Sequence, residues 1–292
     1  MKLPRLMHAA RRRRTLAIER RDPETDWQDI YRQLVLLDFP LETRAGFQVA
    51  FYRPQAVPRM AVVLAGSGHI KANPRRRTFD TGIVIFEVIV GGFESERGRK
   101  MVRLMKALHD RPDIYQADMT YVLNSLMVVP TRYIEKMGWR PLLEVERIAT
   151  WRFWCELGRL IGVESLAASY AEAEEQFDRY EASGQLAASA DGKQLTEMII
   201  GAFADWTPRL LRPHLGQITS ALIDDRRFSD ALGLPRPRRA TRAAMHALYR
   251  IRRFRQRLSP PVTKPGFIPG QPVSDVYPGG YSLDDVGPRV PA

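Results

Sequence analysis

Apolar residues recur at helical spacing in nearly every segment between residues 26 and 258. One such face, near residue 100, consists of Met101, Leu104, Met105 and Leu108. The chain shows no internal repeat and no alternation of strand and helix patterns. The sequence therefore predicts an all-α fold, a single helical domain whose helices bury their apolar faces against one another.

Proline, glycine and capping residues place most of the expected helix boundaries. Asp26, Asn73 and Ser95 each precede an apolar periodic run, as N-caps do. Helices are predicted over residues 26–37, 74–90, 95–111, 118–136, 142–161, 165–181, 193–206, 208–223 and 240–258. Pro130 is expected to interrupt its helix. Residues 45–68 stay ambiguous, because 46–52 also fits a short strand and the apolar run at 57–64 has no assignable period.

The formal charge of +12 lies at the two ends of the chain. Residues 1–21 carry eight basic side chains and one acid, residues 235–258 carry nine arginines and no acid, and the remainder is net negative. A nucleic-acid-binding domain places its basic stripe on the folded body, so this pattern argues against a specific nucleic-acid partner. Basic ends instead favour a peripheral contact with an anionic membrane.

Three regions follow from composition and periodicity. Residues 1–25 form a basic N-terminal extension, residues 26–258 form the helical domain, and residues 259–292 form a Pro/Gly-rich C-terminal tail. The tail lacks the pattern of an independent core, although its aromatic side chains Phe267, Tyr277 and Tyr281 can lie along the body.

Cys155 is the sole cysteine, which excludes an internal disulfide and every zinc site built on paired cysteines. The sequence shows neither a secretory signal nor an apolar stretch of about 20 residues, the length that spans a membrane. We therefore expect a cytoplasmic protein that can be peripheral to a membrane.

Histidines are the first candidates for chemistry, and there are five of them. None forms a metal-binding pair, and neither a Gly-x-Ser-x-Gly elbow nor a phosphate-binding loop is present. His109 ends an apolar helix face, so its imidazole can project into an enclosed pocket and serve as the single protein ligand of a haem iron. The same spacing fits a histidine that caps a helix before Pro112, and spacing alone favours that interpretation.

Arg77 and Thr81 form a second constellation, because residues four apart share one face of a helix. A guanidinium and a hydroxyl on that face can bind an acid or steady bound oxygen, with Asp80 adjacent. The alternative is an ordinary first helical turn with solvated arginines, and the residues alone favour it.

Several segments in order along the chain resemble one known family. They are residues 75–81 (RRRTFDT), 91–99 (GGFESERGR), Leu108-His109, 118–123 (DMTYVL) with Pro130, Gly138-Trp139, 144–146 (EVE), 153–158 (FWCELG) and 232–237 (LGLPRP). Together they cover about residues 45–258 and resemble the MpaB-like oxygenases, a family that extends to the latex-clearing rubber oxygenases. The resemblance implies a globin-like helical bundle around a haem b pocket and oxidative cleavage of a carbon–carbon double bond in an isoprenoid chain.

The resemblance also implies roles for individual residues. His109 matches the proximal iron ligand, and Arg77 and Thr81 match cofactor-binding and catalytic positions near the distal side. Asp80 stands where the rubber oxygenases have a lysine, so their sixth iron ligand and their substrate do not carry over to this chain. Cys155, a rival haem ligand, lies in the most apolar predicted helix, where a buried inert thiol is the commoner outcome.

These observations predict a haem-dependent oxygenase that takes an apolar small molecule and dioxygen. Two alternatives remain: a non-catalytic haem- or lipid-binding protein of the same fold, and a membrane-associated helical scaffold. Bound pigment with oxygen-dependent turnover distinguishes the enzyme from both.

The arginine-rich helix over residues 240–258 is amphipathic. Its apolar stripe, expected to pack on the body, is Ala244, Ala247, Leu248, Ile251, Phe254 and Leu258. Its opposite side, expected to face outward toward anionic lipid, carries Arg242, Arg252, Arg253 and Arg257. A solvated outer face without a membrane role is an equally good interpretation.

Overall fold

The computed structural model describes residues 2–288, with side chains described from residue 9 onward. The predicted basic residues Lys2 and Arg5, together with His8, have side chains outside this part, as does the tail beyond residue 288. The all-α prediction is confirmed: the described residues form helices and turns with no strand, and one isolated β-bridge joins Val273 and Tyr277.

Fourteen α-helices and four short π or 3₁₀ segments make up the described chain. In order they are α1 (Lys2–Glu19), α2 (Trp27–Gln33), η1 (Leu34–Asp38), α3 (Pro40–Phe51), η2 (Arg53–Ala56), α4 (Pro58–Gly66), α5 (His69–Ala72), α6 (Pro74–Gly91), α7 (Glu96–His109), α8 (Gln116–Met137), α9 (Glu144–Ile161), α10 (Tyr170–Ala182), α11 (Ala190–Ala202), η3 (Ala204–Trp206), η4 (Arg209–His214), α12 (Leu215–Ile223), α13 (Arg226–Ala231) and α14 (Arg239–Leu258).

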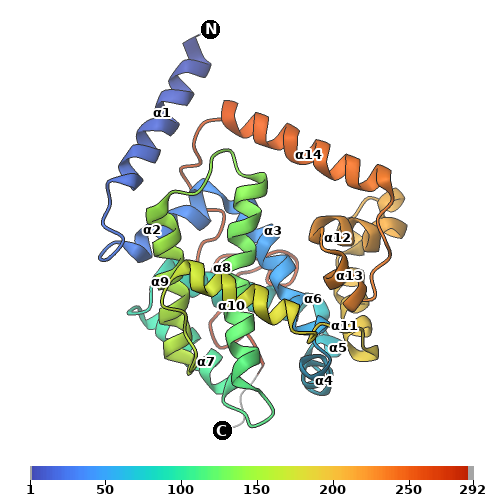
Figure 1. Cartoon of the computed structure of the whole chain (residues 1–292). Coiled ribbons are helices and arrows are strands. Elements are labelled where there is room, and N and C mark those ends of the chain that lie inside the picture. The colour runs from blue at the N-terminus through green and yellow to red at the C-terminus, as the bar shows by residue number, and fades with distance from the viewer. Residues whose placement is uncertain (1, 289–292) are drawn as a thin grey trace.

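Helix α8 runs through the middle of the molecule and is contacted by α3, α9 and α10 (Figure 1). The approach of α3 is close because Gly46 faces Pro130, where an added Cβ would lie 2.3 Å from the proline Cα. Pro130 lies inside α8, which the structure shows as one helix on both sides of it. The expected interruption at Pro130 is therefore wrong, and the close contact with α3 packs around it.

The ambiguous segment at residues 45–68 is helical throughout its regular parts. Pro40 occupies the first turn of α3, where its missing N–H costs nothing. Gly46, Val49 and Ala50 then share the buried face of that helix. The short strand considered for residues 46–52 is wrong, because this face packs on α8 as a helix.

Helices α6 and α7 form an antiparallel pair that positions the candidate site. Asn73 caps α6 by accepting the Arg76 amide at 2.9 Å, and Ser95 caps α7 by accepting the Gly98 amide at 2.9 Å. Gly92, between the two helices, has φ +78°, a conformation that suits glycine. Both predicted helix starts are therefore confirmed.

The C-terminal tail from residue 259 runs along the body from the α14 side toward α7 (Figure 1). Phe267, Tyr277 and Tyr281 are buried in the main apolar core. The Tyr281 hydroxyl donates to the buried carboxylate of Glu87, which also receives two hydrogen bonds from Arg97 at 2.6 and 2.8 Å. The tail thus contributes aromatic side chains to a core that it does not possess alone.

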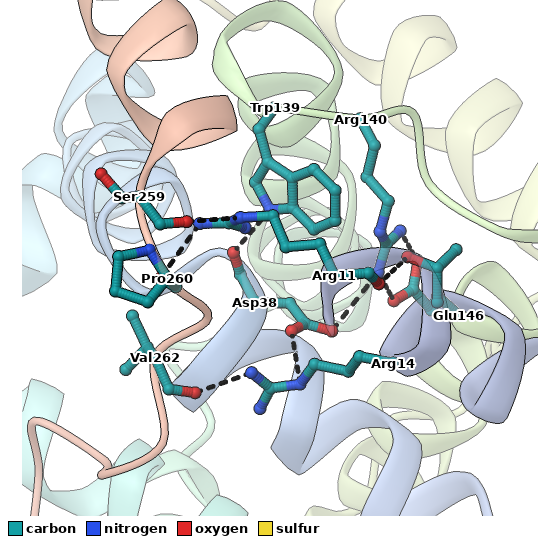
Figure 2. A network of polar contacts seen from close by, with 10 residues as sticks. Arg11, Arg14, Asp38, Trp139, Arg140, Glu146, Ser259, Pro260 and Val262 are labelled. Atoms are coloured by element: carbon teal, nitrogen blue, oxygen red, sulfur yellow. Dashed lines mark hydrogen bonds and ion pairs between the residues drawn. The ribbon is translucent and has the colours of Figure 1, made fainter. Parts of the chain in front are cut away.

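An ion-pair network holds the N-terminal helix α1 against the body (Figure 2). Asp38 is 6% exposed and lies 3.1 Å from Arg14 and 3.3 Å from Arg140. Arg140 also binds Glu146 at 2.6 Å, so two arginines are neutralised by two buried carboxylates. Pairing of this kind offsets the cost of burying the charges.

The same network joins the two ends of the chain (Figure 2). Arg11 donates to the Ser259 carbonyl at 2.9 Å and stacks over the Trp139 ring at 4.5 Å. Arg14 donates to the Val262 carbonyl at 2.7 Å. Part of the basic N-terminal charge is therefore used within the fold, where it fixes the beginning of the tail.

Helix α14 packs on the body with the opposite face to the one expected. Arg252 pairs with buried Glu42 at 3.0 Å, and Arg253 donates to the carbonyls of Lys136 and Gly138 at 2.9 Å. The body surface below α14 offers a buried carboxylate and the free carbonyls at the end of α8, and these acceptors require donors that an apolar stripe lacks. The apolar stripe therefore faces outward, which corrects the expectation.

Among residues 2–288, no helix combines the length and the apolar character needed to cross a membrane.

Candidate functional site

The centre of the candidate site is a cavity of about 260 Å³ lined mainly by α4, α6, α7, α8 and α9, with further residues from α3, η2, α5 and the C-terminal tail. Its walls are mainly aliphatic and include Leu64, Val84, Met105, Leu123 and Leu157. Polar groups are few and sit at defined points, which is the usual composition of a small-molecule site. All three residues selected from the sequence, His109, Arg77 and Thr81, line this one cavity.

His109 is the last residue of α7, and its ring is fixed by its own helix. Nδ1 lies 2.7 Å from the Met105 carbonyl oxygen, which can only accept, so Nδ1 carries the proton. Nε2 is then the basic nitrogen of a neutral ring, and no other described residue within hydrogen-bond distance engages it. This bond also agrees with the alternative that His109 caps the end of its helix. Nδ1 donates to a carbonyl of the last turn, and Nε2 stays available for a ligand.

The ring of His109 is solvent-accessible because it borders the cavity. The protein packed around that cavity nevertheless lowers the pKa of His109 by desolvation, and the positive charge of Arg77 lowers it further against the opposing effect of the Met105 hydrogen bond. A lowered pKa favours the neutral ring, the form that binds a metal.

Arg77 and Thr81 lie one turn apart on α6 and bond to each other. The guanidinium of Arg77 donates to the Thr81 hydroxyl, which donates in turn to the Arg77 carbonyl at 3.0 Å. Desolvation lowers the pKa of Arg77, with the charge of Asp80 opposing this shift. Among the described residues Arg77 has no carboxylate within ion-pair distance, so its remaining N–H groups stay available to a ligand in the cavity.

Asp80 also borders the cavity, but its carboxylate already has partners. The Tyr277 hydroxyl donates to it at 2.6 Å, and Arg76 lies 3.9 Å away. Asp80 is 5% exposed. Asp80 is therefore bound to the C-terminal tail. The sequence marked Tyr277 as able to lie along the body, but no local pattern connects it to Asp80.

The wall at the start of α8 holds a polar cluster that the sequence analysis missed. The carboxylate of Asp118, which is 3% exposed, accepts a hydrogen bond from the Arg59 guanidinium at 2.7 Å and another from the Tyr180 hydroxyl at 2.6 Å. The hydrogen bond to Asp118 raises the pKa of Arg59. These charges neutralise one another, so they close this wall rather than offer a free group. Asp118 begins the segment 118–123 that carries part of the family resemblance, but its partners Arg59 and Tyr180 lie 59 and 62 residues away in the chain.

A second cavity of about 400 Å³ adjoins the first, and Phe51, Thr81, Ile85 and Leu126 line both. The tail covers it with Phe267 and neighbouring residues. Arg44 lies at its edge with its guanidinium 5.8 Å from the centre of the Phe86 ring. The two cavities therefore lie next to each other, and Thr81 borders both.

The remaining candidates do not reach either cavity. Cys155 donates to the Ala167 carbonyl at 3.5 Å, and burial raises the pKa of its thiol to about 11, which matches an inert thiol. His69, His214 and His246 are exposed and line neither cavity. Within the described residues no group of three or more His, Cys, Asp and Glu side chains could hold a bare metal ion.

The donor set fits a haem better than a bare ion. A haem needs one protein nitrogen, and His109 offers Nε2 toward an apolar cavity with its tautomer already fixed. Arg77, on α6, adds a cationic side chain to the wall of the same cavity. The residues present are therefore compatible with a haem held between α6 and α7.

Comparison with known proteins places these features in a family context. The family model described as ER-bound oxygenase mpaB/B'/rubber oxygenase, catalytic domain, matches residues 40–254. ER-bound oxygenase mpaB' of Penicillium brevicompactum is 26% identical over 251 residues, which cover 80% of this chain and 59% of that protein. ER-bound oxygenase mpaB of Penicillium roqueforti is 28% identical over 142 residues, covering 47% of this chain and 48% of that protein.

The chain thus spans about three fifths or less of the curated relatives that it matches. A solved structure of latex clearing protein LCP in the closed state superposes with a TM-score of 0.59 and 19% identity, covering 86% of this chain and 73% of that one. The superposition shows a shared helical fold.

Proposed function

Because the chain belongs to the family of ER-bound oxygenase mpaB/B' and rubber oxygenase catalytic domains, we propose that it is a haem-dependent oxygenase acting on an apolar, isoprenoid- or lipid-like molecule. The observation that carries the proposal is the environment of His109, whose Nδ1 is bonded to the Met105 carbonyl and whose Nε2 is left for a ligand beside an aliphatic cavity. A haem bound there supplies activated dioxygen for attack on a carbon–carbon double bond.

The chain's own residues have distinct tasks in this proposal. His109 binds the iron, and the Met105 carbonyl fixes the plane and tautomer of its ring. Arg77 has N–H groups left for a negatively charged group in the cavity, and Thr81 holds the Arg77 side chain in place by accepting one of its hydrogen bonds. The mainly aliphatic walls lower the local dielectric constant around these groups, which strengthens their electrostatic effect.

The substrate class is inferred from the second cavity. Its aromatic and aliphatic lining suits an extended hydrocarbon, and the residues that it shares with the first cavity bring such a chain past Thr81. A compact substrate would leave most of this surface unfilled, and a polar substrate would find few hydrogen-bond partners on it.

Oxygen isotope labelling tests the function. The purified holoprotein is incubated with ¹⁸O₂ and a long-chain isoprenoid, and the products are analysed by mass spectrometry. We expect shortened carbonyl products that carry ¹⁸O, and none from an His109→Ala variant. His246→Ala removes an exposed histidine and is the matched control.

A non-catalytic haem- or lipid-binding protein is the second candidate. Its support is Asp80, an acid bound to Tyr277 where the resemblance leads us to expect a lysine. Stable haem binding without labelled products from any isoprenoid or unsaturated fatty acid would favour this candidate over the oxygenase.

A further inference from the structure

Helix α14 turns a polar face toward the body and an apolar face outward, the reverse of an ordinary surface helix. Its inner face is polar and binds the body. Arg252 forms an ion pair with Glu42, and Gln256 donates a hydrogen bond to the same carboxylate at 2.8 Å. Arg253 donates to the Gly138 carbonyl at the end of α8. Tyr249 is its one buried residue. The anchoring of the helix therefore leaves its apolar residues on the opposite side.

The outer face of α14 carries a continuous apolar stripe. Its large members and their exposed fractions are Leu248 at 55%, Ile251 at 58%, Phe254 at 64% and Leu258 at 49%. They follow one another at intervals of three and four residues, so they share one side of a helix about 30 Å long. An apolar patch of this kind on a soluble protein indicates a contact surface.

Arginines border this stripe on both sides. Arg250 and Arg255 are exposed, and neither makes an ion pair with any described residue. The helix contains no acidic residue. Helix α1 contacts α14 (Figure 1) and carries the exposed Arg12 and Arg13. The two basic ends of the chain therefore meet at one side of the molecule.

We propose that the outer face of α14, supported by α1, docks this protein on an anionic lipid surface. Leu248, Ile251, Phe254 and Leu258 enter the boundary between headgroups and acyl chains, while Arg250 and Arg255 extend to the lipid phosphates. This geometry is that of an interfacial helix that lies in the plane of the membrane.

The positive charge beside the apolar stripe of α14 favours an anionic lipid surface over a second copy of this chain as the occupant of that face. A second copy of this chain would bring the same arginines against each other, and like charges at an interface oppose association. A lipid bilayer with anionic headgroups matches both the stripe and its positive borders. The proposal does not depend on the oxygenase function, because it rests on α14 and α1 alone.

Co-sedimentation of the full-length protein with vesicles tests the proposal. The vesicles are phosphatidylcholine alone or phosphatidylcholine mixed with phosphatidylserine. We expect binding to the anionic vesicles, weakened by added salt. Ile251→Gln combined with Phe254→Gln should reduce binding about tenfold or more, and Arg250→Gln combined with Arg255→Gln should reduce it about fivefold per arginine.

Leu41→Gln combined with Val62→Gln is the matched control, because both side chains are exposed but lie on α3 and α4. A fluorophore on Phe254→Cys, in a Cys155→Ala background, should shift to the blue on anionic vesicles. Failure of the wild type to bind, equal loss in the control, or no blue shift in bound protein would overturn the proposal. So would a dimer in vesicle-free solution that the Ile251/Phe254 variant dissociates, because a second copy would then occupy the face.

Discussion

The hydroxyl of Tyr277 lies 2.6 Å from a carboxylate oxygen of Asp80, although 197 residues separate them in the chain. The bond joins the C-terminal tail to the helix that carries Arg77 and Thr81. Asp80 is 5% exposed, so its carboxylate depends on protein donors in place of water. The tail thereby determines the polar environment beside the candidate site.

Tyr277→Phe removes this donor and leaves the ring in place. We expect a loss of about 1–3 kcal/mol in the free energy of unfolding, because a buried charged acceptor loses a hydrogen bond. Urea denaturation followed by circular dichroism measures the loss. Tyr115→Phe changes an exposed tyrosine and should be neutral. Equal stability of the two variants would show that the tail contact carries no energy.

Arg77→Ala and Thr81→Ala should impair turnover far more than folding. Their side chains line the cavity and bond to each other, so Arg77→Ala removes a donor from the site and Thr81→Ala removes the side chain that positions it, while the core stays packed. We expect oxygen consumption with an isoprenoid to fall about tenfold or more for each, with helicity unchanged.

Arg103→Ala is the matched control for these variants, because Arg103 is exposed on α7 and lines neither cavity. Unfolding of both site variants, or turnover equal to that of the control, would show that the pair only completes a helical turn.

The thiol of Cys155 should react slowly until the solution is strongly alkaline. Burial raises its pKa from 9.0 to about 11, so the folded protein keeps the proton in the interval where the unfolded chain has lost it. The contribution of this group to stability is therefore complete below pH 9 and is lost as the pH rises through the folded value.

Labelling with iodoacetamide over a pH series measures the reactivity of this thiol, with the urea-unfolded protein as reference. A native labelling curve that coincides with the unfolded one would contradict the half-buried position of Cys155. The same position predicts that Cys155→Ala leaves the visible spectrum unchanged.

The inward arginines of α14 should be structural. Arg252→Gln weakens the neutralisation of Glu42, a buried carboxylate with no solvent exposure, and should cost about 3 kcal/mol or more of stability. Arg250→Gln, on the outer face, should change the free energy of unfolding by less than about 0.5 kcal/mol. Thermal and urea unfolding of both variants compares the two sides of one helix. Equal effects would mean that α14 is not oriented as described.

Local rules predicted most helix positions in this fold. Asn73 and Ser95 cap α6 and α7 because a side-chain oxygen next to free amides is a short-range effect, visible in a few neighbouring residues. The grouping of Arg77 with Thr81 has the same origin, since residues four apart share a helix face. Their position opposite His109 came from the family resemblance, and the structure lines one cavity with all three.

Long-range partners account for what the sequence could not provide. Periodicity identifies an amphipathic helix but does not show which face turns inward. The orientation of α14 is determined by its contacts with Glu42 and with the carbonyls at the end of α8. Tyr277 reaches Asp80 through a tail without regular structure, so no period connects them. Residues 46–51 belong to helix α3, which packs on α8 because Gly46 can approach Pro130 closely. The sequence around either residue does not indicate this contact.

Haem binding through His109 is the central claim, and the Soret band of the purified protein tests it most directly. The wild type, His109→Ala and the exposed-site control His246→Ala are produced with a haem precursor present, and absorbance is measured per folded chain. The account predicts a strong Soret band in the wild type and the control and its loss in His109→Ala, with all three equally helical. A colourless wild type, or equal Soret absorbance in wild type and His109→Ala, would contradict it.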